Sequence, residues 1–262
     1  MGDINLPKRL ENIHVDKNEY IATITIDHPP ANAWNLETMT QFEAVIDAIE
    51  TDKDVRVVIL TGAGKCFSAG FDVSDAVNGA EIGRIGRDLW KRIDRFKKPV
   101  IAAINGVALG GGLELAMCCH FRIMAEHVKN KIGLTELNLG IIPGWGGTQN
   151  LARIVGKSCA LDMMLFSKRI DAAKALEIGL INQISTPENL MADALALAEK
   201  LAIRPPLAVA GVLDALSTGE YEGLDKGWEA EGRHSAIVGS SKDCQEGFRA
   251  FFEKRIPKFK GE

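Results

Sequence analysis

The sequence predicts an α/β fold followed by a purely helical C-terminal region. Strand patterns alternate with helical patterns up to about residue 180, and only helical patterns follow. The segment "RPP" at 204–206 marks a break in the helical part. We therefore expect an α/β core at residues 1–198 and a helical region at 199–262.

The first half of the chain contains three clear elements and two loops. Residues 20–26 alternate between apolar residues and threonine, which indicates a strand with one buried face. Apolar residues recur at helical spacing from Thr38 to Ile49, and "VRVVIL" at 55–60 is typical of a buried strand. The loops are the breaker-rich segment 28–35 and the glycine-rich segment 61–72, after which a polar helix is expected at 81–96.

The second half continues the alternation before it becomes helical. A buried strand is expected at 99–106, a helix directly after it and another strand at 121–126. Three further helices follow. They are expected at 143–156 after a turn, at 171–179 between an Asp N-cap and a Gly, and after Thr186-Pro187.

The composition excludes several classes of protein. The net charge of −4 gives no global field that favours nucleic acid. Five cysteines without a C-x-x-C pair, and histidines without ligand spacing, argue against disulfides and metal. This cysteine usage fits a reducing compartment, so we expect a cytoplasmic protein. We expect no export signal and no membrane segment, because neither an apolar signal core nor 18 consecutive apolar residues occur.

Three consecutive glycines stand at the start of a predicted helix, in "GVALGGGLELAMCCH" at 106–120. Glycines there let backbone N–H groups approach a ligand, and the helix dipole favours a phosphate or a developing oxyanion. Neither nucleotide motif is complete: Ile59 and Cys66 break the Walker pattern around "GAGKC", and "GGGLEL" does not match G-x-G-x-x-G. The oxyanion interpretation remains.

Two glutamates lie in apolar, glycine-flanked surroundings. Glu114 is in the first turn after the glycines, and Glu136 lies in "IGLTELNLGIIPGWGG". Two such carboxylates can hold one water, so that one takes its proton while the other protonates carbon. Taken singly, Glu114 could instead be a partner of the helix dipole and Glu136 a surface loop residue. The pattern alone leaves both interpretations open.

Four blocks of sequence together resemble the crotonase superfamily, and enoyl-CoA hydratases in particular. The resemblance runs from about residue 12 to the C-terminus. It implies a spiral of repeated ββα units, a C-terminal helical trimerisation region, and a homotrimer or a dimer of trimers. It also implies an acyl-CoA thioester substrate, with coenzyme A as part of the substrate and no separate cofactor. The blocks are "FSAGFD" (67–72), "KPVIAAINGVALGGGLELAM" (98–117), "GLTELNLGIIPGWGGTQNLARIVG" (133–156) and "GFRAFFEKRIPKF" (247–259).

The resemblance assigns roles to four residues at the reacting centre. The backbone N–H groups of Phe71 and Gly111 would hold the thioester oxygen. Glu114 would activate water for attack on C3, and Glu136 would exchange the proton at C2. The implied reaction is syn hydration of a 2-enoyl-CoA, as in fatty acid β-oxidation. The presence of both carboxylates favours a hydratase over an isomerase, dehalogenase or thioesterase.

The coenzyme A contacts are implied by the same blocks. Ala69 would meet the adenine through its backbone, Lys65 would lie near the phosphates, and Asp72 belongs to the same binding segment. Phe251 and Lys254 would reach the CoA of a neighbouring subunit. For the two lysines an ordinary solvated position, and for Phe251 simple packing, remain alternatives.

Several positions depart from typical enoyl-CoA hydratases. Phe71 replaces the usual Ala, Ser74 stands where many relatives carry Lys, and His120, at a helix end, is expected to be structural. Trp34 and Trp145 replace smaller residues. We hypothesise that they line the acyl pocket and favour a short, branched or cyclic acyl group. The alternative is that both pack in the core or at a subunit contact.

Two other functions remain open. One is another crotonase-type reaction, such as isomerisation, or hydration or hydrolysis of an alicyclic or dienoyl-CoA. The other is a non-catalytic relative, either RNA-binding or a structural subunit. The acidic chain lacks a basic stripe with interleaved aromatics, which argues against RNA.

Overall fold

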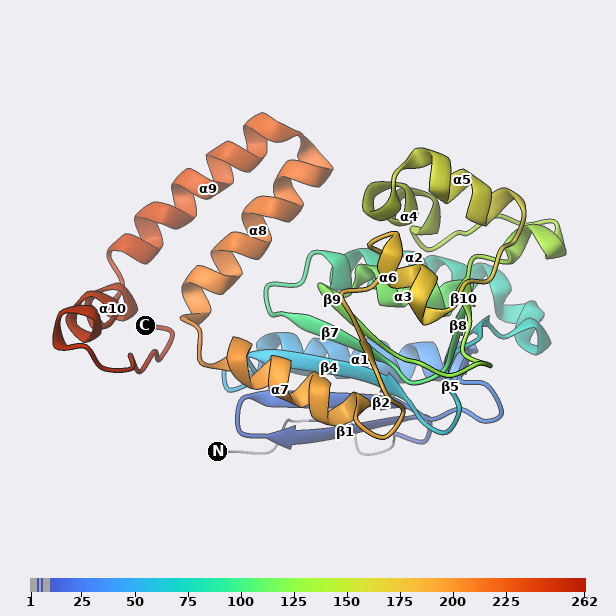
Figure 1. Cartoon of the computed structure of the whole chain (residues 1–262), viewed down its shortest axis with the longest axis horizontal. Helices are drawn as coiled ribbons and strands as arrows, with labels where there is room; N and C mark the ends of the chain where they lie inside the picture. Colours follow the sequence, from blue (N-terminus) through green and yellow to red (C-terminus); the bar gives the residue numbers. More distant parts are fainter. Residues whose placement is uncertain (1–3, 5, 7–9) are drawn as a thin grey trace.

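The computed structural model describes residues 4, 6 and 10–262 and centres on a six-stranded sheet (Figure 1). Its strand order is β1-β2-β4-β7-β9-β11, with β1 and β2 antiparallel and the other neighbours parallel. The strands are β1 (Ile13–Asn18), β2 (Ile21–Ile26), β4 (Val57–Gly62), β7 (Val100–Ile104), β9 (Phe121–Ala125) and β11 (Gln183–Ser185).

Short strands form two further sheets, which together with the large sheet create a spiral. After β2, β7 and β9 the chain adds one short strand to a small sheet, and after β4 it adds one to each of the two small sheets, before it continues into a helix. This is the repeated ββα arrangement that the resemblance implied. The small sheets are β10 (Ile132–Gly133), β8 (Val107–Leu109) and β5 (Cys66–Ser68), and β3 (Ala33–Trp34) with β6 (Gly70–Phe71).

Helices cover both faces of the large sheet, which explains the continuous apolar runs of its strands. In β4, Val58 and Leu60 face the main core, whereas Val57 and Ile59 face a second cluster beneath α7 (Leu190–Ala202). Burial on both faces is typical of parallel sheets. The main core lies under α1 (Leu36–Thr51), α2 (Gly79–Asp94) and α3 (Gly111–Cys118).

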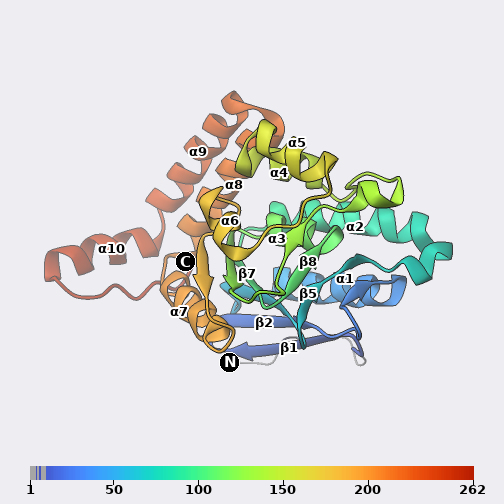
Figure 2. The ribbon, with the colours of Figure 1, turned by 45° about the vertical axis from the view of Figure 1, so that its right-hand side comes forward.

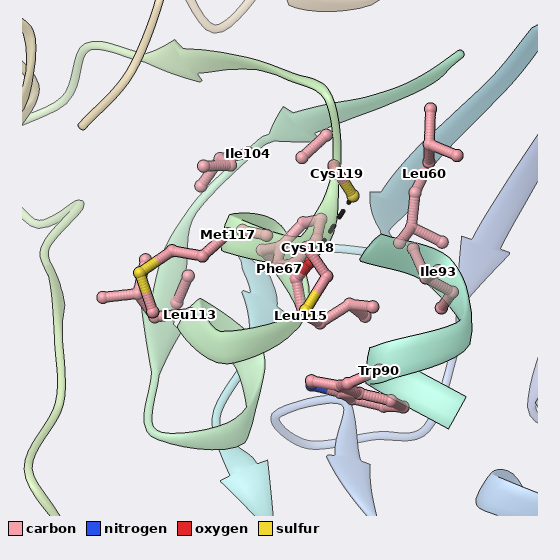
Figure 3. Packing of buried hydrophobic residues seen from close by; sticks show 14 of the residues in the cluster. Leu60, Phe67, Trp90, Ile93, Ile104, Leu113, Leu115, Met117, Cys118 and Cys119 are labelled. Carbon is pink, nitrogen blue, oxygen red and sulfur yellow. Dashed lines mark hydrogen bonds between the residues drawn. The ribbon is translucent and has the colours of Figure 1, made fainter. Parts of the chain in front are cut away.

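Helix α3 lies in the centre of the molecule. All eight of its residues are buried, and Figure 3 shows its side chains enclosed by Leu60, Phe67, Ile93 and Ile104. Apart from Glu114, the helix carries only apolar side chains or glycine, and a helix that is apolar on all sides is typically buried. Cys118 and Cys119 are core residues there, as small apolar side chains.

The C-terminal region is helical and stands apart from the sheets (Figures 1 and 2). It comprises α8 (Pro206–Glu222), α9 (Leu224–Gly239) and α10 (Lys242–Glu253). The expected boundary at 198/199 falls within α7, which continues to Ala202 and packs against the large sheet. The chain leaves the core at Ile203–Pro205, beside the "RPP" segment.

Local patterns predicted four of the longer strands but missed β1 and the short strands. The expected strands at 20–26, 55–60, 99–106 and 121–126 correspond to β2, β4, β7 and β9. Strand β1 and the short strands were not predicted, and β11 contradicts the expectation of helices alone after residue 180. Helices α4 (Gly147–Val155), α5 (Lys157–Leu165) and α6 (Ala172–Glu177) precede β11.

Within residues 10–262, no single helix is long and apolar enough to cross a membrane. Helices α7 and α8 meet that criterion only as a pair, which is bent by 104°.

Candidate active site

The candidate site lies where the end of β6 meets the start of α3. A Cβ atom on Gly70 would lie 2.8 Å from the Gly111 nitrogen, and one on Gly112 would lie 2.2 Å from the Ser68 oxygen. Gly70 and Gly110 also have positive φ angles, of 89° and 51°. Glycine is required here because the two backbone segments touch.

Both predicted oxyanion donors lie at this junction. Gly111 is the first residue of α3, and the first N–H groups of a helix have no intrahelical partner. The N-cap residue, Gly110, has no side chain that could accept a hydrogen bond from them. Directly after β6, the Asp72 N–H donates to the Trp34 carbonyl of β3. Successive N–H groups along a strand point to opposite sides, so the Phe71 N–H points away from β3.

The junction opens into a cavity of about 490 Å³. Its walls come from β6 and the following η1 (Val73–Asn78), α2, the start of α3, η2 (Glu136–Leu139) and the loop before α4. Most of the wall is apolar, and two carboxylates face into it. The lining residues are Ala69, Phe71, Val73, Ala76, Gly79, Ala80, Gly83, Gly110, Gly111, Glu114, Thr135, Glu136, Leu139, Ile141, Ile142, Gly144 and Trp145.

Glu114 is held in the cavity wall by backbone donors. The N–H groups of Trp145 and Gly147 both donate to its Oε1, at 2.8 and 2.7 Å. Its side chain is buried, and this burial, helped by the nearby charge of Glu136, raises its pKa to about 7 against the opposing effect of the two N–H groups. A carboxyl group with this pKa can exchange protons near neutral pH.

Glu136 is the second buried carboxylate and has a free oxygen. Its Oε2 is buried and has no hydrogen-bond partner among the described residues. Its Oε1 would lie 3.1 Å from a Cβ on Gly110, so the carboxylate borders the glycine turn. Burial raises its pKa as well. An unpaired buried oxygen indicates a position where a ligand or water completes the site.

Of the two tryptophans predicted to line the acyl pocket, Trp145 does and Trp34 does not. Trp145 lines the cavity and is 6% exposed. Trp34 is fully buried and packs against Phe42 and edge-on against Trp90. The prediction was wrong for Trp34, because β3 directs its side chain into the core under α1 and α2.

The predicted coenzyme A residues divide into two groups. Ala69 and Phe71 line the cavity. Lys65 and Asp72 do not: Lys65 is exposed in the β4–β5 loop, and Asp72 caps η1 (Val73–Asn78) by accepting from the Ser74 N–H and O–H. The structure thus gives Asp72 a local capping role, and Lys65 remains a prediction.

Three more predicted positions lie outside the cavity of their own chain. Phe251 and Lys254 are exposed on and just after α10, far from α3 (Figure 1). Their contact with a neighbouring subunit remains a prediction. His120 has the expected structural role: its Nδ1 accepts from the Val100 N–H, and burial lowers its pKa to about 4.

Sequence reasoning missed the residues that support the site. The Trp90 Nε1–H donates to the Gly111 carbonyl at 3.0 Å and so fixes the first turn of α3. The two N–H donors to Glu114 come from the segment "PGWGG". Its glycines indicated that the backbone approaches another group closely, but the sequence did not identify that group as Glu114. Among the described residues, no group of three or more His, Cys, Asp and Glu side chains is placed to hold a metal.

Comparison with known proteins gives one consistent family. A family model described as enoyl-CoA hydratase/isomerase matches residues 16–262. A probable enoyl-CoA hydratase of Bacillus subtilis is 41% identical over 94% of this chain and 97% of its own. A short-chain-enoyl-CoA hydratase of Clostridium acetobutylicum is 39% identical over 94% and 96%. The crystal structure of an enoyl-CoA hydratase from Bacillus anthracis matches with a TM-score of 0.92 and 38% identity, over 96% of this chain and all of its own.

Proposed function

The chain belongs to the enoyl-CoA hydratase/isomerase family, and we propose that it is an enoyl-CoA hydratase that adds water syn across the C2–C3 bond of a 2-enoyl-CoA. The observation that carries this proposal is the pair of buried glutamates that share one apolar cavity beside the start of α3. Relatives with hydratase names support the same reaction.

The first step uses the backbone at the β6–α3 junction. The thioester oxygen accepts from the N–H groups of Phe71 and Gly111, which stabilises the negative charge that develops on it. The dipole of α3 adds to this stabilisation, because the donors lie at the helix N-terminus. Removal of one such donor typically costs about 2.7–4 kcal/mol of activation free energy.

The two carboxylates then move the protons. Glu114 as carboxylate takes a proton from water while the water oxygen bonds to C3, and Glu136 as carboxylic acid gives a proton to C2. The pKa of Glu114, about 7, lets it act as a base near neutral pH. Burial raises the pKa of Glu136 and favours its acid form. The net reaction consumes one water and returns both groups after proton exchange between them through solvent.

The reaction needs no separate cofactor in this proposal. Hydration is redox-neutral, and the carboxylates and backbone donors account for each proton and for the developing charge. Coenzyme A enters as part of the substrate. The backbone of Ala69, at the cavity rim, is proposed to meet the adenine, and the exposed Lys65 to lie near the phosphates.

The test is hydration of crotonyl-CoA, followed as loss of the enoyl-thioester absorbance. Wild type should turn over, and Glu114→Gln and Glu136→Gln should each lose roughly 10²- to 10⁴-fold in rate. The Gln variants keep side-chain size, so a loss reports on proton transfer. Activity of either variant close to wild type would contradict its assigned role.

We further propose that the active form is a homotrimer or a dimer of trimers. Apolar side chains are exposed along α8 and α9 around a groove of about 680 Å³, including Leu216 (64%), Leu224 (74%) and Trp228 (66%). A contiguous exposed apolar surface is typical of an interface. In that assembly Phe251 and Lys254 are proposed to reach the CoA of a neighbouring subunit. Light scattering should give three or six chains, and Trp228→Glu should lower that number.

The remaining proposals concern the cellular location of the protein and the partners that it does not bind. All five cysteines are free thiols, which supports a reducing, cytoplasmic location. The net charge of −4 supports the proposal that the protein binds neither RNA nor membranes. A gel-shift assay at low salt should show no RNA complex, and cell fractionation should place the protein in the soluble fraction.

A further inference from the structure

Trp145 borders two cavities. One is the candidate active-site cavity, and the other is a chamber of about 410 Å³. Trp145 belongs to the lining of both. The chamber is lined by charged and polar side chains, among them Arg87, Lys91, Gln149, Arg153, Glu220 and Tyr221.

The indole ring of Trp145 fits between α2 and α3 because glycines at positions 86 and 111 leave room for it. A Cβ on Gly86 of α2 would lie 2.6 Å from Cε2 of Trp145, and one on Gly111 of α3 would lie 2.2 Å from Cζ3. Trp90 packs edge-on against the ring at 5.2 Å. Since any side chain at position 86 or 111 would displace it, the ring occupies a slot that fits it closely.

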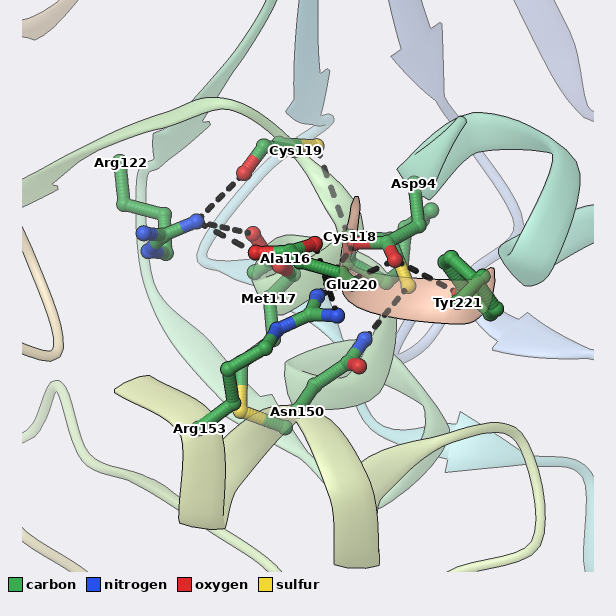
Figure 4. Close-up of polar contacts among 11 residues, drawn as sticks. Asp94, Ala116, Met117, Cys118, Cys119, Arg122, Asn150, Arg153, Glu220 and Tyr221 are labelled. Carbon is green, nitrogen blue, oxygen red and sulfur yellow. Dashed lines mark hydrogen bonds and ion pairs between the residues drawn. The ribbon is translucent and has the colours of Figure 1, made fainter. Parts of the chain in front are cut away.

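Side chains of the chamber lining take part in an ion-pair network (Figure 4). Arg153 of α4 pairs with Asp94 of α2 at 3.0 Å and with Glu220 of α8 at 2.9 Å, and the Tyr221 hydroxyl donates to Asp94 at 2.7 Å. The network ties α2, α4 and α8 together. The chamber is therefore bounded by packed helices, and Trp145 lines both this chamber and the cavity that contains Glu114 and Glu136.

We propose that Trp145 is the end wall of the acyl site and restricts the enzyme to short acyl groups. This proposal rests on the hydratase function above. The ring lies directly against Gly111, whose N–H is proposed to bind the thioester oxygen, so acyl carbons beyond the reacting double bond meet the indole within a short distance. A smaller residue at 145 would join the cavity to the chamber and admit a longer chain.

The backbone and the side chain of Trp145 have separate roles, because the backbone binds Glu114 and the side chain lines the cavity. The backbone N–H donates to Glu114, and every residue except proline would keep this bond. Substitution of the side chain therefore changes the wall without removing a partner of the carboxylate. This separation makes chain-length preference, measured as a ratio of rates, the informative quantity.

The first experiment compares kcat/KM on crotonyl-CoA, 2-octenoyl-CoA and 2-dodecenoyl-CoA for wild type, Trp145→Ala and Trp145→Leu. Wild type should prefer the shortest substrate, and both variants should raise the octenoyl-to-crotonyl ratio at least about tenfold. Gln149→Ala is the matched control, because Gln149 lines the chamber but not the cavity, so its truncation leaves the Trp145 wall in place and should leave the ratio unchanged. Equal use of long and short substrates by wild type, or an unchanged ratio in both variants, would overturn the proposal.

A binding series separates this proposal from the hydratase assignment. Calorimetry with butyryl-CoA and dodecanoyl-CoA needs no catalysis, and wild type should bind the shorter ester more tightly while Trp145→Ala loses that preference. If wild type shows this binding preference but hydrates no enoyl-CoA, the hydratase proposal is refuted and the end-wall role of Trp145 is supported. If it hydrates crotonyl-CoA but binds both esters equally, the end-wall role is refuted and the hydratase proposal is supported.

A stability cycle tests the slot without any substrate. Gly86→Ala should lower the melting temperature of wild type, because its Cβ would clash with the ring. In the Trp145→Ala background, Gly86→Ala should leave the melting temperature unchanged or raise it, because alanine favours a helix more than glycine does. The same loss in both backgrounds would show that Gly86 does not accommodate the ring, and would overturn this account of how the wall is held.

Discussion

Glu114→Gln should make the protein more stable at the expense of its activity. In wild type, burial raises the pKa of Glu114 from 4.5 to about 7, so ionisation of this group disfavours the folded state. Glutamine removes the charge and keeps the shape. Both backbone N–H donors bind a single oxygen, Oε1, so one amide oxygen can accept both bonds.

The size of the effect follows from linkage. The difference between 4.5 and about 7, at about 1.4 kcal/mol for each pH unit, corresponds to roughly 3 kcal/mol. Well below pH 4.5 Glu114 is protonated in both the folded and the unfolded state, so its ionisation does not change the free energy of unfolding. As pH rises towards 7 the unfolded chain ionises first, so wild type loses stability relative to the variant, and above pH 7 the difference is constant.

The assay is urea denaturation of both proteins at pH 5 and pH 8, at one protein concentration so that assembly contributes equally. The free energy of unfolding of Glu114→Gln should exceed that of wild type by about 3 kcal/mol at pH 8 and by much less at pH 5. A difference that does not change with pH, or one that favours wild type at pH 8, would refute the assigned burial and charge state of Glu114.

Three further predictions test the surroundings of the site. Gly112→Ala should cost about 1–3 kcal/mol or more of folding free energy, measured by denaturation, because its Cβ would lie 2.2 Å from the Ser68 carbonyl oxygen. Trp90→Phe should lower kcat on crotonyl-CoA roughly tenfold with little change in KM, because Gly111 loses the bond that fixes its peptide. Dialysis against EDTA should leave the hydration rate unchanged, and loss that Mg²⁺ or Zn²⁺ restores would contradict a cofactor-free reaction.

The main elements of the fold could be predicted because their patterns are local. Strand β2 alternates, with Ile24 and Ile26 in the core and Thr23 and Thr25 half-buried. Strands β4 and β7 are continuous apolar runs because helices cover both faces of the sheet. The short strands escaped prediction, since two or three residues carry no period and pair only through tertiary contacts.

The site was predictable where glycine and charge stand out against an apolar background. Glu114 and Glu136 were found in this way, and the glycines at 110–112 indicated a close backbone approach. The two tryptophans could not be distinguished from the sequence. Trp34 and Trp145 look alike in sequence, yet one enters the core and the other the cavity wall, because β3 and the loop before α4 direct them differently.

The measurement that tests the central claim most directly is the rate of crotonyl-CoA hydration by wild type, Glu114→Gln, Glu136→Gln and the double variant. If the carboxylates act as one unit on one water and one substrate, each single variant should lose roughly 10²- to 10⁴-fold, and the double variant should be little slower than the slower single variant. Losses that multiply in the double variant, or a single variant close to wild type, would contradict a shared catalytic pair.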